Sequence, residues 1–554
     1  MKHVARSIAK LKVTFVAILL LASFVAAQDQ VVHPVRVQRP VAFDVSAPVG
    51  ELVKLPVHGQ PNDRDLEVDA LSTPTPEKRF RRITDPIEQT HVGDRQSFSL
   101  GLNELGLGFG FPNFQIGCVC MSDENLAVGD TQVAEYVNVS FEVFDKASGN
   151  PILGPIREDQ LWAGLPGNCA TDLSSDVIVQ WDKAAHRWLF LHNTGGYQHL
   201  SICIAVSTTP DATGSYYRYE YPINVFWDYP KWGVWNNGYY QTYYSGYPQV
   251  NAFDRAKMLN GDPSAEMVNF QLGANDRQPL PADIDSTTPP PGNEDEFLIG
   301  GIGVTDNAHL SLYSVHVDWM NPQNSTITGI NSSQLIEIAP FTPACNGDYG
   351  PPTEGCIPQL GTDNLLTPDG DRLMYRFAYS NDSVGAHVGP HAGPLPKQHW
   401  LLSHTVTASA GQNSVRWYEF VAPEHTVPVT ALTVAQQGTY APDAHHRFQS
   451  SIARDKAGDI LVGYTVSGAD IYPEIAVAGR TLSDPLGTLG PEQVVFSGTA
   501  PQNSVYHSWG DYSSMALDAA DGCTFWYVGM YYTIPSISQW STRIASAKFP
   551  NCGQ

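Results

Sequence analysis

From about residue 115 onward, short apolar runs recur along the chain, separated by clusters of Gly, Asn, Asp and Pro. The clearest stretch is 174–224, in which residues 176–182, 187–192, 201–207 and 216–221 form four such runs. Runs of this length, rich in β-branched and aromatic residues and bounded by turn residues, predict β-strands. Four consecutive antiparallel strands in about fifty residues are typical of one blade of a β-propeller.

The same four-strand pattern starts again near residues 123, 231, 283, 373, 447 and 513. The sequence therefore predicts an all-β protein with a single seven-bladed β-propeller over residues 115–554. The last repeat has only three good strands, and we expect residues 109–116 to supply the fourth, which protects the sheet edges. Two separate β-sandwiches are the competing architecture. Six or eight blades also fit, because the fourth repeat is the vaguest.

The N-terminal part has a different character. Residues 1–27 combine four basic residues, an apolar run at 13–25 and small residues at Val25-Ala26-Ala27, the pattern of a cleaved secretory signal peptide. An uncleaved anchor is the alternative, but the run is short for a membrane span. Residues 28–114 are rich in Pro, Val, Asp and Arg without a sustained period, and predict a partly ordered N-terminal extension. We expect a secreted, extracellular or periplasmic protein without a membrane span after cleavage.

Composition narrows the function classes. The 554 residues carry a formal net charge of −24, which becomes −28 without the signal peptide. This acidic balance gives no electrostatic reason to bind nucleic acid. Charged residues make up 16% and aromatic residues 11%, which argues against disorder and favours half-buried strands. GxSxG, P-loop, HExxH and EF-hand motifs are absent from the sequence, so we predict no cofactor.

Export makes the eight cysteines readable as disulfides. We predict three bonds, Cys345–Cys356 across a Gly/Pro-rich loop, Cys523–Cys552 at the C-terminal tail, and Cys169–Cys203. Cys118 and Cys120 are too close for an easy mutual bond, and their partners stay open. Zinc is the rival hypothesis, but the paired CxxC spacing that it needs is missing, so we predict no metal.

Two local patterns resemble known propellers. Residues 514–526, with Ser514, Asp518, Gly522 and Trp526 at regular spacing, resemble the Asp-box hairpins of sialidase-like propellers. The chain from about 115 to 552 also resembles secreted bacterial β-propeller proteins of unassigned activity. The segments that carry this resemblance are 205–219, 371–376 and 509–514. The resemblance implies a propeller fold and export, but it implies no catalytic residues, because the Asp-box is a folding motif.

Candidate chemistry lies in the loops that precede the first strand of each predicted blade, called here the lead-in loops. An ionisable side chain recurs in each of them, while the loops that join the second strand of a blade to the third carry tyrosines. Ligands of propellers commonly bind at the face of the central channel, where these two sets of loops meet. We predict a catalytic group of four residues and a substrate-binding group of six. They are His446, Arg447, Asp511 and Tyr512, and then Asp228, Lys231, Arg376, Tyr197, Tyr247 and Tyr472. Arg447 is expected to pair with Asp511, and a neighbouring His to titrate near neutral pH.

A structural alternative applies to each of these groups. Asp before a strand is often a turn residue that bonds its own backbone. Repeated acids can therefore be repeated turn chemistry. The histidines His387, His391, His399 and His404 suggest a metal site, but no carboxylate run completes it, and ordinary loop histidines are the better interpretation.

Acids and bases surrounded by aromatic rings favour an extracellular glycan as the ligand. The sequence leaves open whether the protein only binds the glycan or also cleaves it as a glycoside hydrolase or polysaccharide lyase. A hydrolase needs two carboxylates beside the scissile bond. The alternative from a different class is a non-catalytic propeller that binds a surface or matrix protein. In either case we expect a monomer.

Overall fold

The computed structural model describes most of the chain between residues 31 and 553. The predicted signal peptide lies outside the described residues, as do Cys118, Cys120, Tyr197, His387 and His391. The described residues are 31–55, 82–93, 95, 97–115, 121–171, 176–194, 200–273, 276, 279–286, 288–290, 294–301, 307–347, 355–370, 372–381, 397–422, 429–504 and 507–553.

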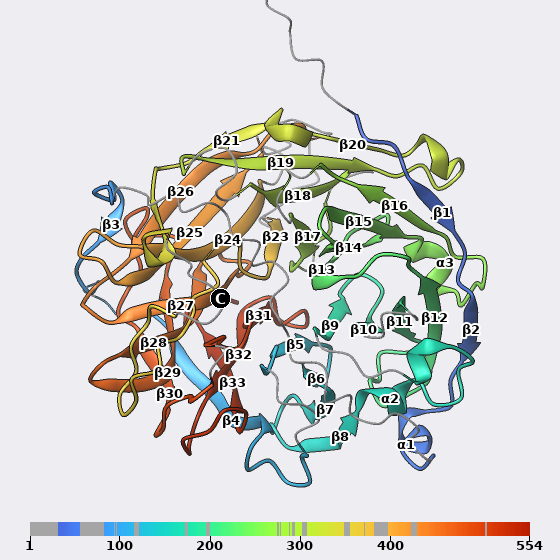
Figure 1. The fold of residues 1–554 in the computed structure, drawn as a ribbon, viewed down its shortest axis with the longest axis horizontal. Helices are drawn as coiled ribbons and strands as arrows, with labels where there is room; N and C mark the ends of the chain where they lie inside the picture. The colour runs from blue at the N-terminus through green and yellow to red at the C-terminus, as the bar shows by residue number, and fades with distance from the viewer. Residues whose placement is uncertain are drawn as a thin grey trace, which may run out of the picture.

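The fold is all-β, and its mostly antiparallel sheets stand side by side around a common centre, in a propeller-like arrangement (Figure 1). Within the described residues, hydrogen bonding forms one sheet of eleven strands, two of five and three of four. The described helices are all short, and none is long and apolar enough to cross a membrane. They are α1 (Val49–Leu52), α2 (Glu158–Leu161), α3 (Arg255–Leu259) and the 3-10 helices at Asn168–Ala170, Pro322–Asn324, Ile330–Ser332 and Ala344–Gly347.

Three four-strand units follow one another up to residue 271. The first contains β5 (Asn125–Val128), β6 (Gln132–Val137), β7 (Ser140–Asp145) and β8 (Pro151–Arg157). The second contains β9 (Ile178–Asp182), β10 (Arg187–Asn193), β11 (Ser201–Ser207) and β12 (Tyr216–Pro222). The third contains β13 (Asp228–Val234), β14 (Tyr239–Tyr244), β15 (Pro248–Phe253) and β16 (Met267–Gln271).

The next two units are hydrogen-bonded into the eleven-stranded sheet, because β17 and β23 pair in parallel. The fourth contains β17 (Leu280–Ile284), β18 (Glu296–Gly300) and β19 (His309–His316), with β20 (Thr326–Thr328) and β21 (Leu335–Glu337) both on β19. The fifth contains β23 (Phe377–Asn381), β24 (Gln398–Thr407), β25 (Asn413–Val421) and β26 (Thr433–Tyr440), with β22 (Thr342–Pro343) on β24.

The last two units bring the chain back to the first. The sixth contains β27 (His446–Arg454), β28 (Ile460–Gly468), β29 (Ile471–Arg480) and β30 (Gln493–Ser497). The final one contains β31 (Ser514–Leu517), β32 (Thr524–Tyr531) and β33 (Ser541–Lys548). The first strands of successive units contact one another, and β31 contacts β5.

N-terminal strands extend four of these units. β1 (Arg36–Gln38) pairs with β16, and β2 (Ala42–Val45) pairs with β12, so both lie along the outer rim (Figure 1). β3 (Glu88–Gln89) pairs with β26 in parallel. β4 (Ser99–Gly108) pairs with β33 and completes the final unit. The N-terminal strand therefore lies earlier in the chain than the expected 109–116, because β4 carries the alternating leucines that face the core.

Both faces of an inner strand are covered, which explains why the sequence shows apolar runs as well as alternation. In β10, Trp188 and Phe190 pack into the apolar layer shared with the first unit, while Leu189 and Leu191 pack into the layer shared with the third. Successive side chains of a strand point to opposite faces, so neighbouring units share one layer each. The core is thus a series of layers between sheets.

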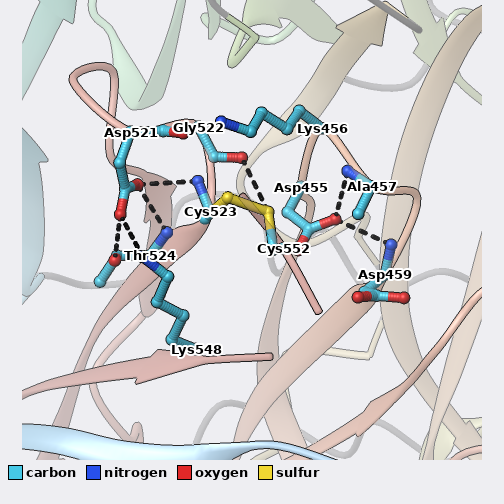
Figure 2. The surroundings of a disulfide bond; sticks show 10 residues. All are labelled: Asp455, Lys456, Ala457, Asp459, Asp521, Gly522, Cys523, Thr524, Lys548 and Cys552. Atoms are coloured by element: carbon cyan, nitrogen blue, oxygen red, sulfur yellow. Dashed lines mark hydrogen bonds and ion pairs between the residues drawn. A yellow bond between two sulfur atoms is a disulfide. The ribbon is translucent and has the colours of Figure 1, made fainter. Parts of the chain in front are cut away.

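The structure forms the three disulfides predicted from cysteine spacing, Cys169–Cys203, Cys345–Cys356 and Cys523–Cys552. Figure 2 shows Cys523–Cys552 beside two hairpin turns of neighbouring units. In each turn an aspartate accepts from backbone N–H groups of its own loop, Asp455 from Ala457 and Asp521 from Cys523. Lys456 N–H donates to Gly522 O at 3.0 Å, which joins the turns. These turns are stabilised by Asx chemistry.

A buried carboxyl group lies where the final unit meets the first. Glu135 of β6 accepts from Leu107 N–H of β4 at 2.7 Å and from Thr542 Oγ1 of β33 at 2.5 Å. Glu142 pairs across β6 and β7 with Glu135 and is also fully buried. Burial raises the pKa of Glu135 to about 7, and burial followed by the charge of Glu135 raises the pKa of Glu142 to about 8.

Folding stability should therefore fall as the pH rises from 5 to 8. The folded protein keeps the Glu142 proton at pH values where the unfolded chain, with a pKa near 4.5, has lost it. Glu142→Gln removes this penalty and should recover up to ~4 kcal/mol of the loss, since one pKa unit corresponds to about 1.4 kcal/mol. Urea unfolding at both pH values measures the effect. The exposed Glu104→Gln is the control, and an unchanged pH dependence in Glu142→Gln would contradict the prediction.

Candidate functional site

The lead-in loops share a backbone feature that positions their side chains. Residues just before regular strand pairing have positive φ angles in five units. They are Asp123 (46°), Asp176 (59°), Tyr229 (53°), Gln449 (50°) and Asp511 (64°). Asp tolerates this left-handed conformation better than most residues. These angles agree with the structural alternative, in which an aspartate before a strand is a turn residue. The same bend also brings side chains of different units together.

Three of these side chains meet at one point. Asp123, Asp176 and Asp511 each place one carboxylate oxygen within 4.8 Å of the other two. Asp176 N–H donates to Asp123 Oδ2 at 3.1 Å, and Asp123 N–H donates to Gly510 O at 3.1 Å. Burial, and next the charges of Asp176 and Asp511, raise the pKa of Asp123 well above its usual value. Burial also raises the pKa of Asp176.

Lys231 is the basic group of this cluster. Its Nζ donates to Pro230 O at 3.2 Å and lies 3.4 Å from the ring centre of Tyr229 and 3.7 Å from that of Tyr512. Burial lowers the pKa of Lys231 to about 8, against the attraction of the three aspartates. The ammonium group therefore contacts two aromatic faces and one carbonyl oxygen. Its buried surroundings stabilise the positive charge less than water does, which is why its pKa is lowered.

Aromatic rings fill the space beside Lys231. Tyr512 is fully buried, and its hydroxyl donates to Val177 O at 3.3 Å. The hydroxyl of Tyr229 donates to Asp511 O at 3.4 Å. The Arg372 guanidinium lies 4.5 Å from the Tyr229 ring centre. Asp511 and Arg372 are each 8% exposed, so they are the members of the cluster that solvent reaches most easily.

Arg376 belongs to a separate ion network. Its Nε donates to Asp283 Oδ2 at 2.6 Å, and its Nη2 lies 3.1 Å from Asp285 Oδ1. Lys183 also pairs with Asp285. Arg376 Nη1 further donates to Met515 O at 2.7 Å. This network ties β17 to β31 and buries Arg376, so its placement is that of a structural residue between units.

Arg447 does not form the ion pair with Asp511 that the sequence predicts. It is fully buried and bonds Asp443 at 2.9 Å and Glu492 at 2.7 Å. His446 accepts from Asn413 N–H at 3.2 Å, and burial lowers its pKa to about 4, not near neutrality. The cause is a register shift in β27, where a bulge between Phe448 and Ser451 follows the first three residues. Gln449 occupies the lead-in position that the sequence assigned to His446 and Arg447.

The predicted aromatic residues are dispersed. Tyr247 is 48% exposed in the turn between β14 and β15, and Tyr472 contacts the Gly361 loop. Asp228 opens β13 and pairs in register with Tyr244. His399 and His404 are buried in β24 and not in a loop; they lie 2.7 Å from Glu419 and 2.9 Å from the Tyr418 hydroxyl, respectively.

Cys169, His192 and Cys203 form a second close group. Since the two sulfurs are joined in a disulfide, they cannot act as thiolate ligands. His192 is buried against Trp162, and burial lowers its pKa to about 3. This group is therefore part of the core of the second unit.

The cluster contains Asp123, Asp176, Lys231 and Arg372, but of these only Lys231 is among the site residues predicted from the sequence. Tyr229 was not singled out, although it lies between two selected residues. The recurring acidic residue before each strand is the signal that points to this part of the loop. In the third unit Tyr229 has the positive φ angle that an aspartate has in the first, second and last units. The sequence does not reveal this, because tyrosine is not a typical residue for a positive φ angle.

Comparison with known proteins finds structures that resemble this fold but no family to which the chain belongs. No protein-family model matches the chain, and no curated protein matches it. Among solved structures, it is similar to the WD40 domain of SCAP from fission yeast (9% identity, TM-score 0.36, 82% of this chain and 98% of that one). It is also similar to a subtype N11 neuraminidase-like protein of A/flat-faced bat/Peru/033/2010 (H18N11) (8%, 0.29, 74% and 96%). A third is an exo-β-1,3-galactanase from Clostridium thermocellum (9%, 0.29, 79% and 88%). Likenesses this distant carry no argument about function.

The placement of Arg447 predicts that it stabilises the fold. Arg447→Met removes the partner of Asp443 and Glu492, both of which are partly exposed, and should cost about 2 kcal/mol. Thermal unfolding measures this loss. Arg95→Met, a change of an exposed arginine, is the control. An unchanged melting temperature for Arg447→Met would show that the two ion pairs contribute nothing to stability.

Proposed function

We propose that this protein is a secreted, monomeric, seven-bladed β-propeller that binds an extracellular carbohydrate on the face formed by its lead-in loops. Four considerations support the proposal: the arrangement of the units, the disulfides, the charged group at the centre and the exposed aromatic rings at one end of the third unit.

Seven blades follow if each unit is counted by its first strand. These strands are β5, β9, β13, β17, β23, β27 and β31, and they contact one another in chain order. β17 and β23 pair in parallel, and parallel neighbours need a long connection between them. Here the connection is the rest of the fourth unit, so the pairing joins the inner edges of two neighbouring blades. β4 completes the last blade from the N-terminal side.

Export is supported by the three disulfides, since such bonds persist in oxidising compartments. The signal-peptide pattern of residues 1–27 and the resemblance to secreted bacterial propellers agree with this location. Extracellular glycans are abundant ligands in that environment, and a protein without a cofactor motif can bind them through its side chains alone.

The observation that carries the proposal is the charged cluster at the centre. Buried, closely spaced ionisable groups with shifted pKa values cost stability, and they are more common at functional sites than elsewhere. Asp511 and Arg372, each 8% exposed, would contact the ligand. Lys231 and Tyr512 would support them from beneath. Carboxylate and guanidinium groups bind sugar hydroxyls by hydrogen bonds.

Exposed aromatic rings stand at the same end of the third unit. Phe226, just before β13, is 43% exposed, and Tyr247, just after β14, is 48% exposed. Asp228 at the start of β13 pairs in register with Tyr244, so these residues border one sheet end. Apolar ring faces beside polar groups form the composition of a small-molecule site.

Binding is favoured over cleavage. A hydrolase would have to bring two carboxylates to the scissile bond. Asp123 is fully buried and Asp176 nearly so, and therefore only Asp511 of the three could reach a substrate. The sequence predicts His446 and Arg447 as catalytic residues. In the structure His446 contacts Asn413, and Arg447 contacts Asp443 and Glu492.

Tyr247→Ala should weaken glycan binding about tenfold, the equivalent of ~1.4 kcal/mol, without changing the melting temperature. The ring is exposed, so its loss removes ligand contact and little packing. A glycan array identifies ligands of the purified protein, and calorimetry compares the variant. Leu486→Ala, an exposed apolar residue remote from the lead-in loops, is the control.

Two results would separate the alternatives. Release of reducing ends from the same glycans would identify a hydrolase, or an elimination product a lyase. No binding and no product across a broad array would overturn the glycan proposal and favour the propeller that binds another protein.

A further inference from the structure

The three aspartates of the lead-in loops come from distant parts of the chain. Asp123 precedes the first unit, Asp176 the second and Asp511 the last. From their geometry we infer that Asp123, Asp176 and Asp511 form a binding site for a divalent cation that prefers oxygen ligands, with Ca²⁺ as the extracellular candidate. This inference does not depend on whether the protein binds glycans.

The spacing of the oxygens fits such an ion. One oxygen from each carboxylate lies within 4.8 Å of the other two. Ca²⁺ binds oxygen at about 2.3–2.6 Å, so two of its ligands are at most about 5 Å apart. The three oxygens can therefore share one ion with small adjustments of side-chain torsions. Ca²⁺ accepts six to eight oxygen ligands, and water can supply the remainder.

Independent evidence comes from oxygen atoms without a hydrogen-bond partner. Asp123 Oδ1 and Asp176 Oδ1 are buried, and neither has a partner among the described residues. Their residues are 0% and 2% exposed. A buried carboxylate oxygen without a donor is costly. Both residues belong to the group that converges on one point, and we expect a cation there to take these two oxygens as ligands.

The charges around the group are consistent with a cation of moderate affinity. Three carboxylates face Lys231, whose ammonium is engaged by Pro230 O and by the rings of Tyr229 and Tyr512. The Arg372 guanidinium lies over the ring of Tyr229. Two basic residues therefore lie near three acidic ones. Repulsion from Lys231 would lower the affinity of the site for a cation without preventing its binding. Hard carboxylate ligands favour Ca²⁺ or Mg²⁺ over metals that prefer thiolate or imidazole.

A bound ion would connect the first, second and last units and hold the ring of lead-in loops together. Ca²⁺ should therefore raise the melting temperature of protein treated with EDTA and dialysed. At a hundredfold excess over the dissociation constant we expect a rise of about 3 °C for a chain of this size. Calorimetric titration with CaCl₂ should give one site per chain, and MgCl₂ a weaker one. Tb³⁺ bound there should show luminescence sensitised by Tyr229 and Tyr512.

Asp123→Asn and Asp176→Asn should each abolish the Ca²⁺-dependent rise and the titration signal. Glu142→Gln, which alters a buried carboxyl group outside the cluster, should keep both. The measurement on the wild-type protein decides the matter even if a variant fails to fold. No heat, no Tb³⁺ luminescence and no change in melting temperature up to 10 mM CaCl₂, which is about tenfold above a weak extracellular site, would overturn the inference. A Ca²⁺ response that persists in both aspartate variants would overturn it as well.

Discussion

The pairing of β4 with β33 is the interaction on which the arrangement depends. It joins strands near the two ends of the chain, with Arg543 donating to Asn103 across 440 residues of sequence. Closing so long a loop has an entropic cost that grows only slowly with length, so one well-paired strand can offset it. Without β4, the outer edge of β33 would lie open, and an open edge invites pairing with other chains.

Glu135 connects this closure to the first unit. Its carboxyl group accepts from both β4 and β33, and it belongs to β6 of the next unit. A hydrogen bond in an interior of low dielectric is strong, but an unpaired partner there is costly. The junction therefore requires all three strands in place at once, which makes the closure specific. β1, β2 and β3 add to the edges of three other units in the same way, but they close nothing.

The contact between the last unit and the first determines what the lead-in loops can do. Asp511 of the last unit can approach Asp123 of the first only because β31 and β5 are in contact. Asp123 N–H bonded to Gly510 O shows the two loops joined through the backbone as well. The convergence of the carboxylates is thus a consequence of the packing of the last unit against the first, and their mutual repulsion lowers the stability of this packing. A site built this way is sensitive to anything that loosens the junction.

Much of the fold could be predicted from the sequence, because alternation and turn residues are local signals. β9 to β12 lie where the apolar runs of 174–224 place them, and the disulfides follow from cysteine spacing. β1, β2 and β3 could not be predicted, since strands of two to four residues have no periodicity. At the site, the lead-in aspartates were recognised as a group, but the bulge in β27 was not. That one irregularity moves Arg447 from the centre to Glu492, because a shift in strand pairing re-aims every side chain before it. Local sequence patterns therefore locate the loops of a propeller-like fold, while the partner of each side chain depends on pairing register that only the assembled sheets determine.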